Sequence, residues 1–241
     1  LFYSFKIKWI IVYSLYISNL NADLTSEELL IADEIVAVAK RLYDRNCLAA
    51  ADGNISVRIN DDRILISPSG VSKAFMQPHD MAVIQVNGEV VSGNPSGERK
   101  MHLAVYRHCP QAKAVVHAHP PTAIAWSVAR PELKELPNSC LSEVILAAGS
   151  IPIAPYARPG NEDMGTVLEP YLPNHRAMIL SRHGALTWGK SLNEAWMGME
   201  RIEHVSQILA RAEQLGGLTH LPDEEVEALK AMRESMGPRL L

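Results

Sequence analysis

The hydrophobic positions repeat first with the period of a helix. From Thr25 onward, apolar residues recur every three or four positions until about Leu48, which predicts a helix with one buried face. Thr25 and Glu28 have the spacing of a capping box, in which each side chain accepts a hydrogen bond from the other residue's backbone N–H. We therefore expect the folded domain to begin just before this helix and to cover residues 23–241.

Short alternating runs follow the helix and predict two β-hairpins. The first pairs residues 55–59 with 64–67 across a polar turn. The second pairs 81–86 with 89–92 across Asn87-Gly88, the strongest short turn signal in the chain. Because tight turns join antiparallel strands, we expect a mostly antiparallel sheet.

The remainder of the chain alternates between helical and strand-like periods. In chain order, the pattern predicts a helix at 95–108, a strand at 114–116, a helix at 121–130, strand-like pieces at 144–146, 151–154, 177–181 and 185–188, and helices at 191–209 and 222–236. Ser191 and Glu194 form a second candidate capping box. No repeat or Gly/Ser linker divides the chain, so this order predicts one layered α/β domain.

Residues 1–22 differ from the rest. Leu1 to Ile17 is aromatic and aliphatic with two early lysines, like the start of a signal peptide. The run is shorter than the roughly 20 apolar residues that cross a bilayer, and no small-residue cleavage pattern follows it. We interpret residues 1–22 as an N-terminal extension that adds an element or packs on a neighbour, with export or a gene-prediction artefact as alternatives.

Composition narrows the choice of partners and compartment. The 241 residues are 47% hydrophobic and carry a net charge of −4, which argues against nucleic acid but leaves room for a small acidic substrate. Cys47, Cys109 and Cys140 are an odd number without a CxxC pair, as a reducing compartment tolerates. We therefore expect a cytoplasmic protein without a membrane segment.

Three histidines have the placement of metal ligands. His117 and His119 end an apolar run and would project from the same face of a strand, and His183 follows another apolar run before a glycine. Three neutral imidazoles leave the fourth position of a zinc ion open for water or substrate. The alternative is that they are buried structural histidines. The other histidines lack paired spacing and are interpreted as surface or packing residues: His79, His102, His108, His175, His204 and His220.

Glu98 lies where a loop enters a predicted helix, after Ser96 and Gly97. A glutamate at a helix start is often there only because it complements the helix dipole. The same loop, however, offers a hydroxyl and free N–H groups to an anion. The loops 53–54 and 67–70 carry similar donors, so each is either an ordinary turn or part of an anion site.

Six segments in a fixed order resemble the class II aldolase and adducin head family, whose best-known member is fuculose phosphate aldolase. The segments are Gly53–Arg58, Ile66–Gly70, Pro95–Glu98, Val115–His119, Pro155–Ala157 and His183–Gly184. The resemblance extends from about Thr25 to Gly217 and implies a three-layer α/β/α domain in a ring-shaped homotetramer, with each active site at a subunit boundary.

The resemblance also implies roles for individual residues. The zinc ligands, or ligands of another divalent metal, are His117, His119 and His183, and the catalytic residue is Glu98. The substrate phosphate-binding positions are Asn54, Ser69, Gly70, Ser96 and Gly97. The implied reaction is the cleavage of a ketose 1-phosphate to dihydroxyacetone phosphate and a short aldehyde, with the metal as Lewis acid and Glu98 moving the proton.

Two positions depart from the family pattern. The aldolase has a serine where this chain has Gly97, and its proton-donating tyrosine falls on Glu143 here. Related epimerases carry an aspartate where Glu98 stands, which favours the aldolase. A sugar-phosphate dehydratase, decarboxylase or epimerase on the same scaffold remains an alternative, and so does a non-catalytic adducin-like domain. A cupin is disfavoured, because Pro120-Pro121-Thr122 follows the paired histidines.

Overall fold

A single sheet forms the centre of the molecule in the computed structural model, which describes residues 24–172 and 174–236. Within these residues eight strands are joined in the order β4-β3-β2-β1-β5-β8-β7-β6. The strands are β1 (Asn54–Arg58), β2 (Arg63–Ile66), β3 (Ala82–Gln85), β4 (Val90–Ser92), β5 (Ala114–Ala118), β6 (Ile153–Ala154), β7 (Ala177–Leu180) and β8 (Gly184–Gly189). Only β6 and β7 pair in parallel in the described chain, so the predicted mostly antiparallel sheet is confirmed.

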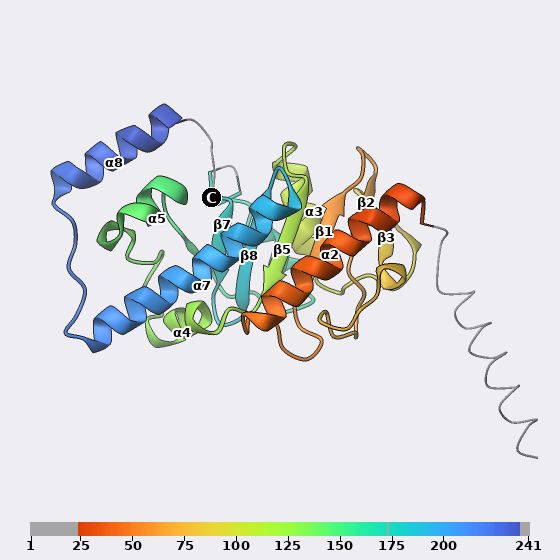
Figure 1. The fold of residues 1–241 in the computed structure, drawn as a ribbon, viewed down its shortest axis with the longest axis horizontal. Coiled ribbons are helices and arrows are strands. Elements are labelled where there is room, and N and C mark those ends of the chain that lie inside the picture. The colour runs from red at the N-terminus through yellow and green to blue at the C-terminus, as the bar shows by residue number, and fades with distance from the viewer. Residues whose placement is uncertain (1–23, 173, 237–241) are drawn as a thin grey trace, which may run out of the picture.

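Helices cover both faces of the sheet (Figure 1). They are α2 (Ser26–Asp44), α3 (Arg99–His108), α4 (Pro121–Ala129), α5 (Ser142–Ala147), α6 (Asp163–Thr166), α7 (Leu192–Gln214) and α8 (Asp223–Met236), with short 3-10 turns at Pro78–Asp80 and Asn138–Cys140. In Figure 1, α2 and α7 cross the front of the sheet and α3 lies behind it. The three-layer α/β/α arrangement is thus confirmed, whereas the predicted extension at 1–22 lies outside the described residues.

Strand β5 shows why two cores form. Its Val116 and Ala118 join the core beneath α2 and α7, whereas Val115 points to the opposite face and joins the core beneath α3 and α6. Alternate residues of a strand point to opposite faces, so one strand supplies both cores. His117 therefore shares the α3 face with Val115.

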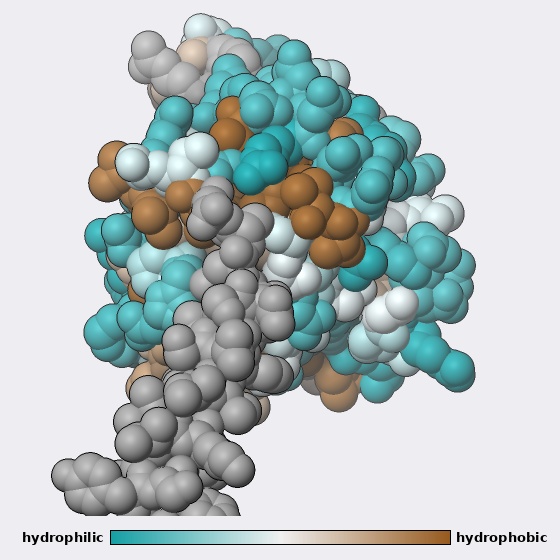
Figure 2. Space-filling view, turned by 90° about the vertical axis from the view of Figure 1, so that its right-hand side faces the viewer, coloured by the Kyte–Doolittle hydropathy of each residue, from teal (hydrophilic) through white to brown (hydrophobic). Residues whose placement is uncertain are grey.

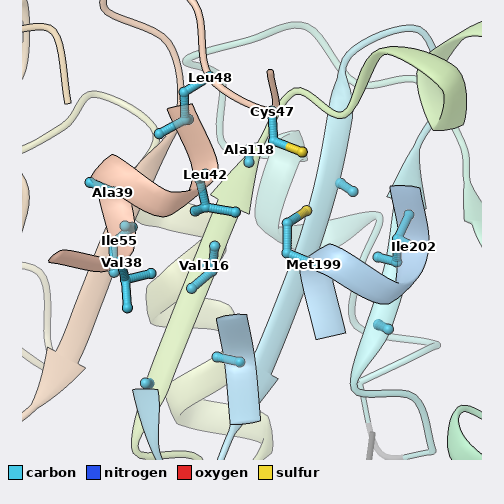
Figure 3. Packing of buried hydrophobic residues seen from close by; sticks show 14 of the residues in the cluster. Val38, Ala39, Leu42, Cys47, Leu48, Ile55, Val116, Ala118, Met199 and Ile202 are labelled. Atoms are coloured by element: carbon cyan, nitrogen blue, oxygen red, sulfur yellow. The ribbon is translucent and has the colours of Figure 1, made fainter. Parts of the chain in front are cut away.

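The front core fixes α2 and α7 on the middle of the sheet. Figure 3 shows Leu42 of α2 beside Val116 and Ala118 of β5, with Met199 of α7 next to them and Ile202 further along α7 in the same core. Full burial of a side chain such as Leu or Met stabilises the fold by about 1.5–3 kcal/mol. This packing holds β5 in place up to the point where the histidines begin.

The N-terminal capping box is present as predicted. The N–H of Thr25 donates to Glu28 Oε2 at 2.9 Å, and the N–H of Glu28 donates to Thr25 Oγ1 at 3.2 Å. Arg63 of β2 donates to the same carboxylate, which links α2 to the sheet. Burial raises the pKa of Glu28, but the bonds from Arg63 and Thr25 outweigh it and leave the pKa below its ordinary value.

Helix α2 ends at Asp44, earlier than the predicted end near Leu48. Asn46 adopts a left-handed φ of 59°, and the N–H of Cys47 bonds back to the carbonyl of Leu42. A left-handed asparagine closing the last turn in this way ends a helix.

Residues 144–146 are helical, so the strand predicted there is wrong. A run of three apolar residues does not distinguish a strand from a buried helical turn. Val144 and Ile145 are buried, and Arg233 of α8 donates to the carbonyls of Leu146 and Ala147. Contacts with α8, distant in sequence, thus stabilise the helix.

The second capping box is only half formed. Ser191 accepts from the N–H of Glu194 at 3.2 Å, but the Glu194 carboxylate accepts from the N–H of Lys190 and from Arg176. Arg176, just before β7, binds the carboxylate of Glu194 and so keeps it from the N–H of Ser191.

The outer surface has hydrophobic patches between polar areas. Figure 2 shows several of them on the side that lies at the right of Figure 1. Large exposed apolar side chains of the described chain include Leu30, Phe75 and Val91. None of the helices in residues 24–172 and 174–236 is both long and apolar enough to cross a membrane.

Substitution of Gly53 tests the approach of the loop before β1 to the end of β5. Gly53 has a φ of +73°, and a Cβ there would overlap the Leu48 side chain and lie 2.9 Å from the His117 carbonyl oxygen. Gly53→Ala should lower the free energy of unfolding by about 2 kcal/mol or more. Gly97→Ala is the control, because a Cβ at Gly97 meets nothing within 4 Å. Equal urea midpoints for the two variants would contradict this prediction.

Candidate active site

Four potential metal ligands meet at one end of the sheet. The donor atoms of Glu98, His117, His119 and His183 all lie within 4.8 Å of one another. His117 is the last residue but one of β5, His119 follows the strand, and His183 lies in the turn between β7 and β8. Glu98 comes from the α3 side, immediately before the first residue of that helix. Segments far apart in sequence are thus brought together by sheet pairing and by α3.

The protons of two imidazoles point away from the cluster. His117 Nδ1 lies 2.8 Å from the carbonyl oxygen of Ala185, which can only accept, so Nδ1 carries the proton. His119 Nδ1 lies 3.4 Å from Asp52 Oδ2, where a proton is also stabilised. The hydrogen bond of His117 and the carboxylate contact of His119 are of the kind that metal-binding histidines make, because they leave Nε2 free to bind the ion.

The inward-facing atoms are close enough together to share a cation. His117 Nε2 lies 3.2 Å from His119 Nε2 and 3.3 Å from Glu98 Oε2, and His183 Nε2 lies 3.1 Å from Glu98 Oε1. Lone pairs and carboxylate oxygens at these distances repel one another unless a positive charge lies among them. Three imidazoles and a carboxylate are a ligand set that zinc accepts, so the residues fit a divalent metal.

The ionisation of the cluster is also suited to a metal. Burial lowers the pKa of His119, and the nearby His117 and His183 lower it further. Burial raises the pKa of Glu98, but interactions with His117 and His183 outweigh it and hold the pKa well below its ordinary range. Neutral imidazoles and an ionised carboxylate are the forms that bind metals.

Gly184 allows the rings to approach. A Cβ at this position would lie 2.6 Å from the Ala118 carbonyl oxygen, 2.8 Å from the His117 ring and 2.9 Å from the His119 ring. Any larger residue would displace both imidazoles. The glycine after His183 is therefore a packing requirement of the cluster.

The two candidate phosphate loops lie side by side next to Glu98. The N–H of Ser69 donates to the Asn94 carbonyl at 2.9 Å, and the N–H of Ser96 donates to the Ser67 carbonyl at 3.3 Å. Ser96 Oγ also accepts from the N–H of Glu98 at 3.3 Å. Gly70 and Gly97 are exposed at the tips of these loops, where their backbone can meet an anion.

Asn54 lies between the metal cluster and α3. Its register partner across the sheet is His117, and its side-chain amide donates to Glu98 Oε2 at 2.9 Å. His102, which the sequence analysis assigned to the surface or to packing, is fully buried and bonded to Asn54 and Ser56. The only sequence signal for His102 was its spacing of four residues from Glu98, which places both on the same side of a helix.

Lys73 is a second residue that the sequence analysis missed. Its side chain is buried, and Nζ donates to the carbonyls of Ala51 at 2.9 Å and Val71 at 2.6 Å. Burial lowers the pKa of Lys73, although Asp52 and Glu98 act in the opposite direction. The lysine joins the loop before β1 to the loop after Gly70, and so connects two of the candidate anion-binding segments.

Glu143, the position that aligns with the family's tyrosine, lies elsewhere. It is exposed in the first turn of α5, and this helix packs against α8. The four-residue cluster does not include it among the described residues.

A three-layer fold with three imidazoles and a carboxylate converging at the end of its sheet has the make-up of a metalloenzyme. The profile of the Class II Aldolase and Adducin N-terminal domain matches residues 33–210. The chain belongs to this family and is an enzyme of the class II aldolase superfamily, in which a divalent metal is used.

Relatives that are named for different reactions are about equally similar to this chain in sequence. The chain is 30% identical over 194 residues to the 3-oxo-tetronate 4-phosphate decarboxylase of Escherichia coli, covering 78% of this chain and 90% of the relative. It is 30% identical over 214 residues to the 5-deoxy-D-ribulose 1-phosphate aldolase of Bacillus thuringiensis, covering 85% and 96%. The solved structure of an L-fuculose 1-phosphate aldolase matches with a TM-score of 0.76 at 27% identity, covering 88% and 98%.

Removal of one imidazole tests the metal site. His119→Ala should lose most of the bound metal, because it removes one of the four candidate ligands and zinc binding weakens when a protein ligand is lost. His204→Ala is the control, since His204 is exposed on α7. Elemental analysis after dialysis measures the metal per chain. Full metal content in His119→Ala would exclude this histidine as a ligand.

Proposed function

We propose that this protein is a zinc-dependent carbon–carbon lyase that cleaves a ketose 1-phosphate to dihydroxyacetone phosphate and a short aldehyde. The observation that carries the proposal is the position of Glu98, whose two carboxylate oxygens lie 3.1 Å from His183 and 3.3 Å from His117. A base at this place could take a proton from a substrate carbon next to an oxygen that a metal on His117, His119 and His183 would bind.

The residues have separate tasks. His117, His119 and His183 would hold the metal, which when bound supplies Lewis-acid stabilisation of negative charge on substrate oxygens. Glu98, ionised and partly buried, accepts a proton from the carbon next to the carbonyl group or returns one to it. Asn54 holds one carboxylate oxygen of Glu98 by its amide N–H.

The phosphate group is assigned to the two adjacent loops. Ser69, Gly70, Ser96 and Gly97 offer hydroxyl and backbone donors beside Glu98, and the loop containing Ser96 leads directly into α3. The N-terminus of this helix attracts an anion. The relatives named above act on phosphorylated compounds, which supports a sugar phosphate as the substrate class.

Decarboxylation of a phosphorylated 3-oxo acid is the second candidate. Aldol cleavage requires removal of a hydroxyl proton from the departing fragment, and Glu143 does not lie beside the cluster within the described protomer. Loss of carbon dioxide requires no such step, because the departing group carries no proton to remove. The relative from Escherichia coli carries out a decarboxylation by its name.

A homotetramer is proposed as the assembly. The exposed apolar residues Leu30, Phe75 and Val91 belong to the kind of surface that subunit contacts cover. A neighbouring subunit would then be the source of the hydroxyl base, since Glu143 of the same protomer lies away from the cluster in the described residues.

A substrate panel separates the two candidates. The zinc-loaded protein should release dihydroxyacetone phosphate from ketose 1-phosphates, including 5-deoxy-D-ribulose 1-phosphate, but carbon dioxide only slowly from 3-oxo-tetronate 4-phosphate. The reverse preference would assign the second candidate. Dephosphorylated analogues should react at least about 100-fold more slowly in kcat/KM, because a charge-assisted anion site of roughly 3 kcal/mol remains unused. Equal rates with the dephosphorylated analogues would remove the phosphate assignment.

Exchange of hydrogen with heavy water tests Glu98. The protein should exchange one hydrogen of dihydroxyacetone phosphate without any aldehyde present. Glu98→Gln keeps the size and the bond to Asn54 but takes up no proton, so exchange should fall by about 10² or more while the histidines retain the metal. Glu169→Gln is the control, because Glu169 is half-exposed, pairs with His108 at the end of α3 and is not part of the four-residue cluster. Exchange at the normal rate in Glu98→Gln would place the base elsewhere.

A further inference from the structure

A continuous line of buried hydrogen bonds runs from Glu98 into the core behind the sheet. Asn54 Nδ2 lies 2.9 Å from Glu98 Oε2, and Asn54 Oδ1 contacts His102 Nε2. His102 Nδ1 lies 2.6 Å from Ser56 Oγ, and Ser56 Oγ lies 2.8 Å from Tyr106 Oη. Five side chains from α3 and β1 thus form one connected path.

The spacing of these residues explains why they meet. Glu98, His102 and Tyr106 are four residues apart and lie on one side of α3, and Asn54 and Ser56 are two apart on the same face of β1. The exposed fractions of Asn54, Ser56, His102 and Tyr106 are 1%, 0%, 0% and 2%. Polar groups this deeply buried must satisfy one another, so the direction of every bond matters.

The carboxylate of Glu98 determines which atom donates and which accepts in every hydrogen bond of the path. An ionised Glu98 only accepts, so the Asn54 amide must present its NH₂ to Glu98 and its oxygen to His102. His102 must then carry its proton on Nε2. Its Nδ1 accepts from the Ser56 hydroxyl, and the Ser56 oxygen accepts from the Tyr106 hydroxyl.

The imidazole of His102 is neutral and therefore has a single N–H to donate to Asn54. Burial is the largest effect on the imidazole, nearby His117 acts in the same direction, and together they lower the pKa of His102 to about 3. A neutral ring has one N–H and one lone pair, which the path requires at Nε2 and Nδ1.

We propose that His102 is a positioning residue for the reaction: its Nε2–H holds the Asn54 amide in the one orientation that donates to Glu98 and fixes that carboxylate beside the metal ligands. The inference rests on the proposed role of Glu98 in proton transfer. With the amide reversed, Asn54 would turn its oxygen toward the carboxylate, and the two would repel. Glu98 would then move from its place between Asn54 and His183.

The tautomer of His102 is a direct test that requires no substrate. Solid-state ¹⁵N NMR of the zinc-loaded, histidine-labelled protein should show a neutral His102 protonated at Nε2 from pH 6 to pH 8. The signal is assigned by its disappearance in His102→Gln. A neutral ring protonated at Nδ1, or a doubly protonated ring, would overturn the proposal. Because the NMR measurement uses no substrate, it can contradict the role of His102 without contradicting the proposed function, and the reverse also holds.

A pair of substitutions distinguishes positioning from space filling. His102→Gln places an amide N–H near the position of Nε2 and so keeps the donor to Asn54, whereas His102→Asn reaches only the position of Nδ1. His102→Asn should lower kcat by about 10- to 100-fold, since small displacements of a catalytic group have effects of this size. His102→Gln should remain within about threefold of the unmutated protein, because the donor that orients Asn54 is restored.

Controls separate this effect from loss of fold or metal. His108→Asn and His108→Gln make the same changes at an exposed histidine of α3 that pairs with Glu169, and they should leave kcat unchanged. Metal content and the unfolding midpoint are measured for every variant, and kcat is expressed per metal-loaded chain. Equal kcat values for His102→Asn and His102→Gln, whether both normal or both reduced, would show that His102 only fills space. If His102→Asn does not fold, the tautomer and the His102→Gln result decide the question.

Discussion

The close packing of the ligand atoms of Glu98, His117, His119 and His183 at the end of β5 is the constraint on which the rest of the structure depends. Three imidazole nitrogens and one carboxylate oxygen all lie within 4.8 Å of one another. A carboxylate removed from water loses several kcal/mol of solvation unless charges or hydrogen bonds replace it. The surrounding architecture provides those replacements and leaves a position for a cation.

Each side of the cluster is held by a different part of the fold. Pairing of β5 with β8 aligns His117 with the Ala185 carbonyl that accepts its proton, and the turn before β8 brings in His183. Helix α3 presents Glu98 from the opposite layer, and β1 supplies Asn54 between them. The sheet and its turns carry the three candidate metal ligands, while α3 and its preceding loop carry the proposed base and the proposed anion-binding donors. This division suits a site in which different substrates can be accommodated by changes in loops.

The fold was predictable where local patterns agree with tertiary packing. The hairpins around Asn60 and Asn87, the capping box at Thr25 and the helix after Pro95 are all encoded within short segments, and all are confirmed. The strand predicted at 144–146 failed because Val144 and Ile145 are apolar in either secondary structure, and only contact with α8 decides between them. Likewise, the carboxylate of Glu194 binds Arg176 and does not complete the predicted capping box, because Arg176 is a neighbour in space that the local sequence does not reveal.

In the candidate site, too, some features were predictable from the sequence and others only from the tertiary structure. By itself, the sequence determined which residues could carry chemistry, because paired histidines at the end of an apolar run, a glycine after a third histidine and a glutamate in a loop are local signals. The tertiary structure alone decided that His102 and Lys73 are buried and hydrogen-bonded next to the candidate site and that Glu143 lies away from it. The physical reason is that hydrogen-bond partners and burial are properties of neighbours in space. A histidine on a helix has the same local pattern whether it faces water or completes a buried path to a carboxylate.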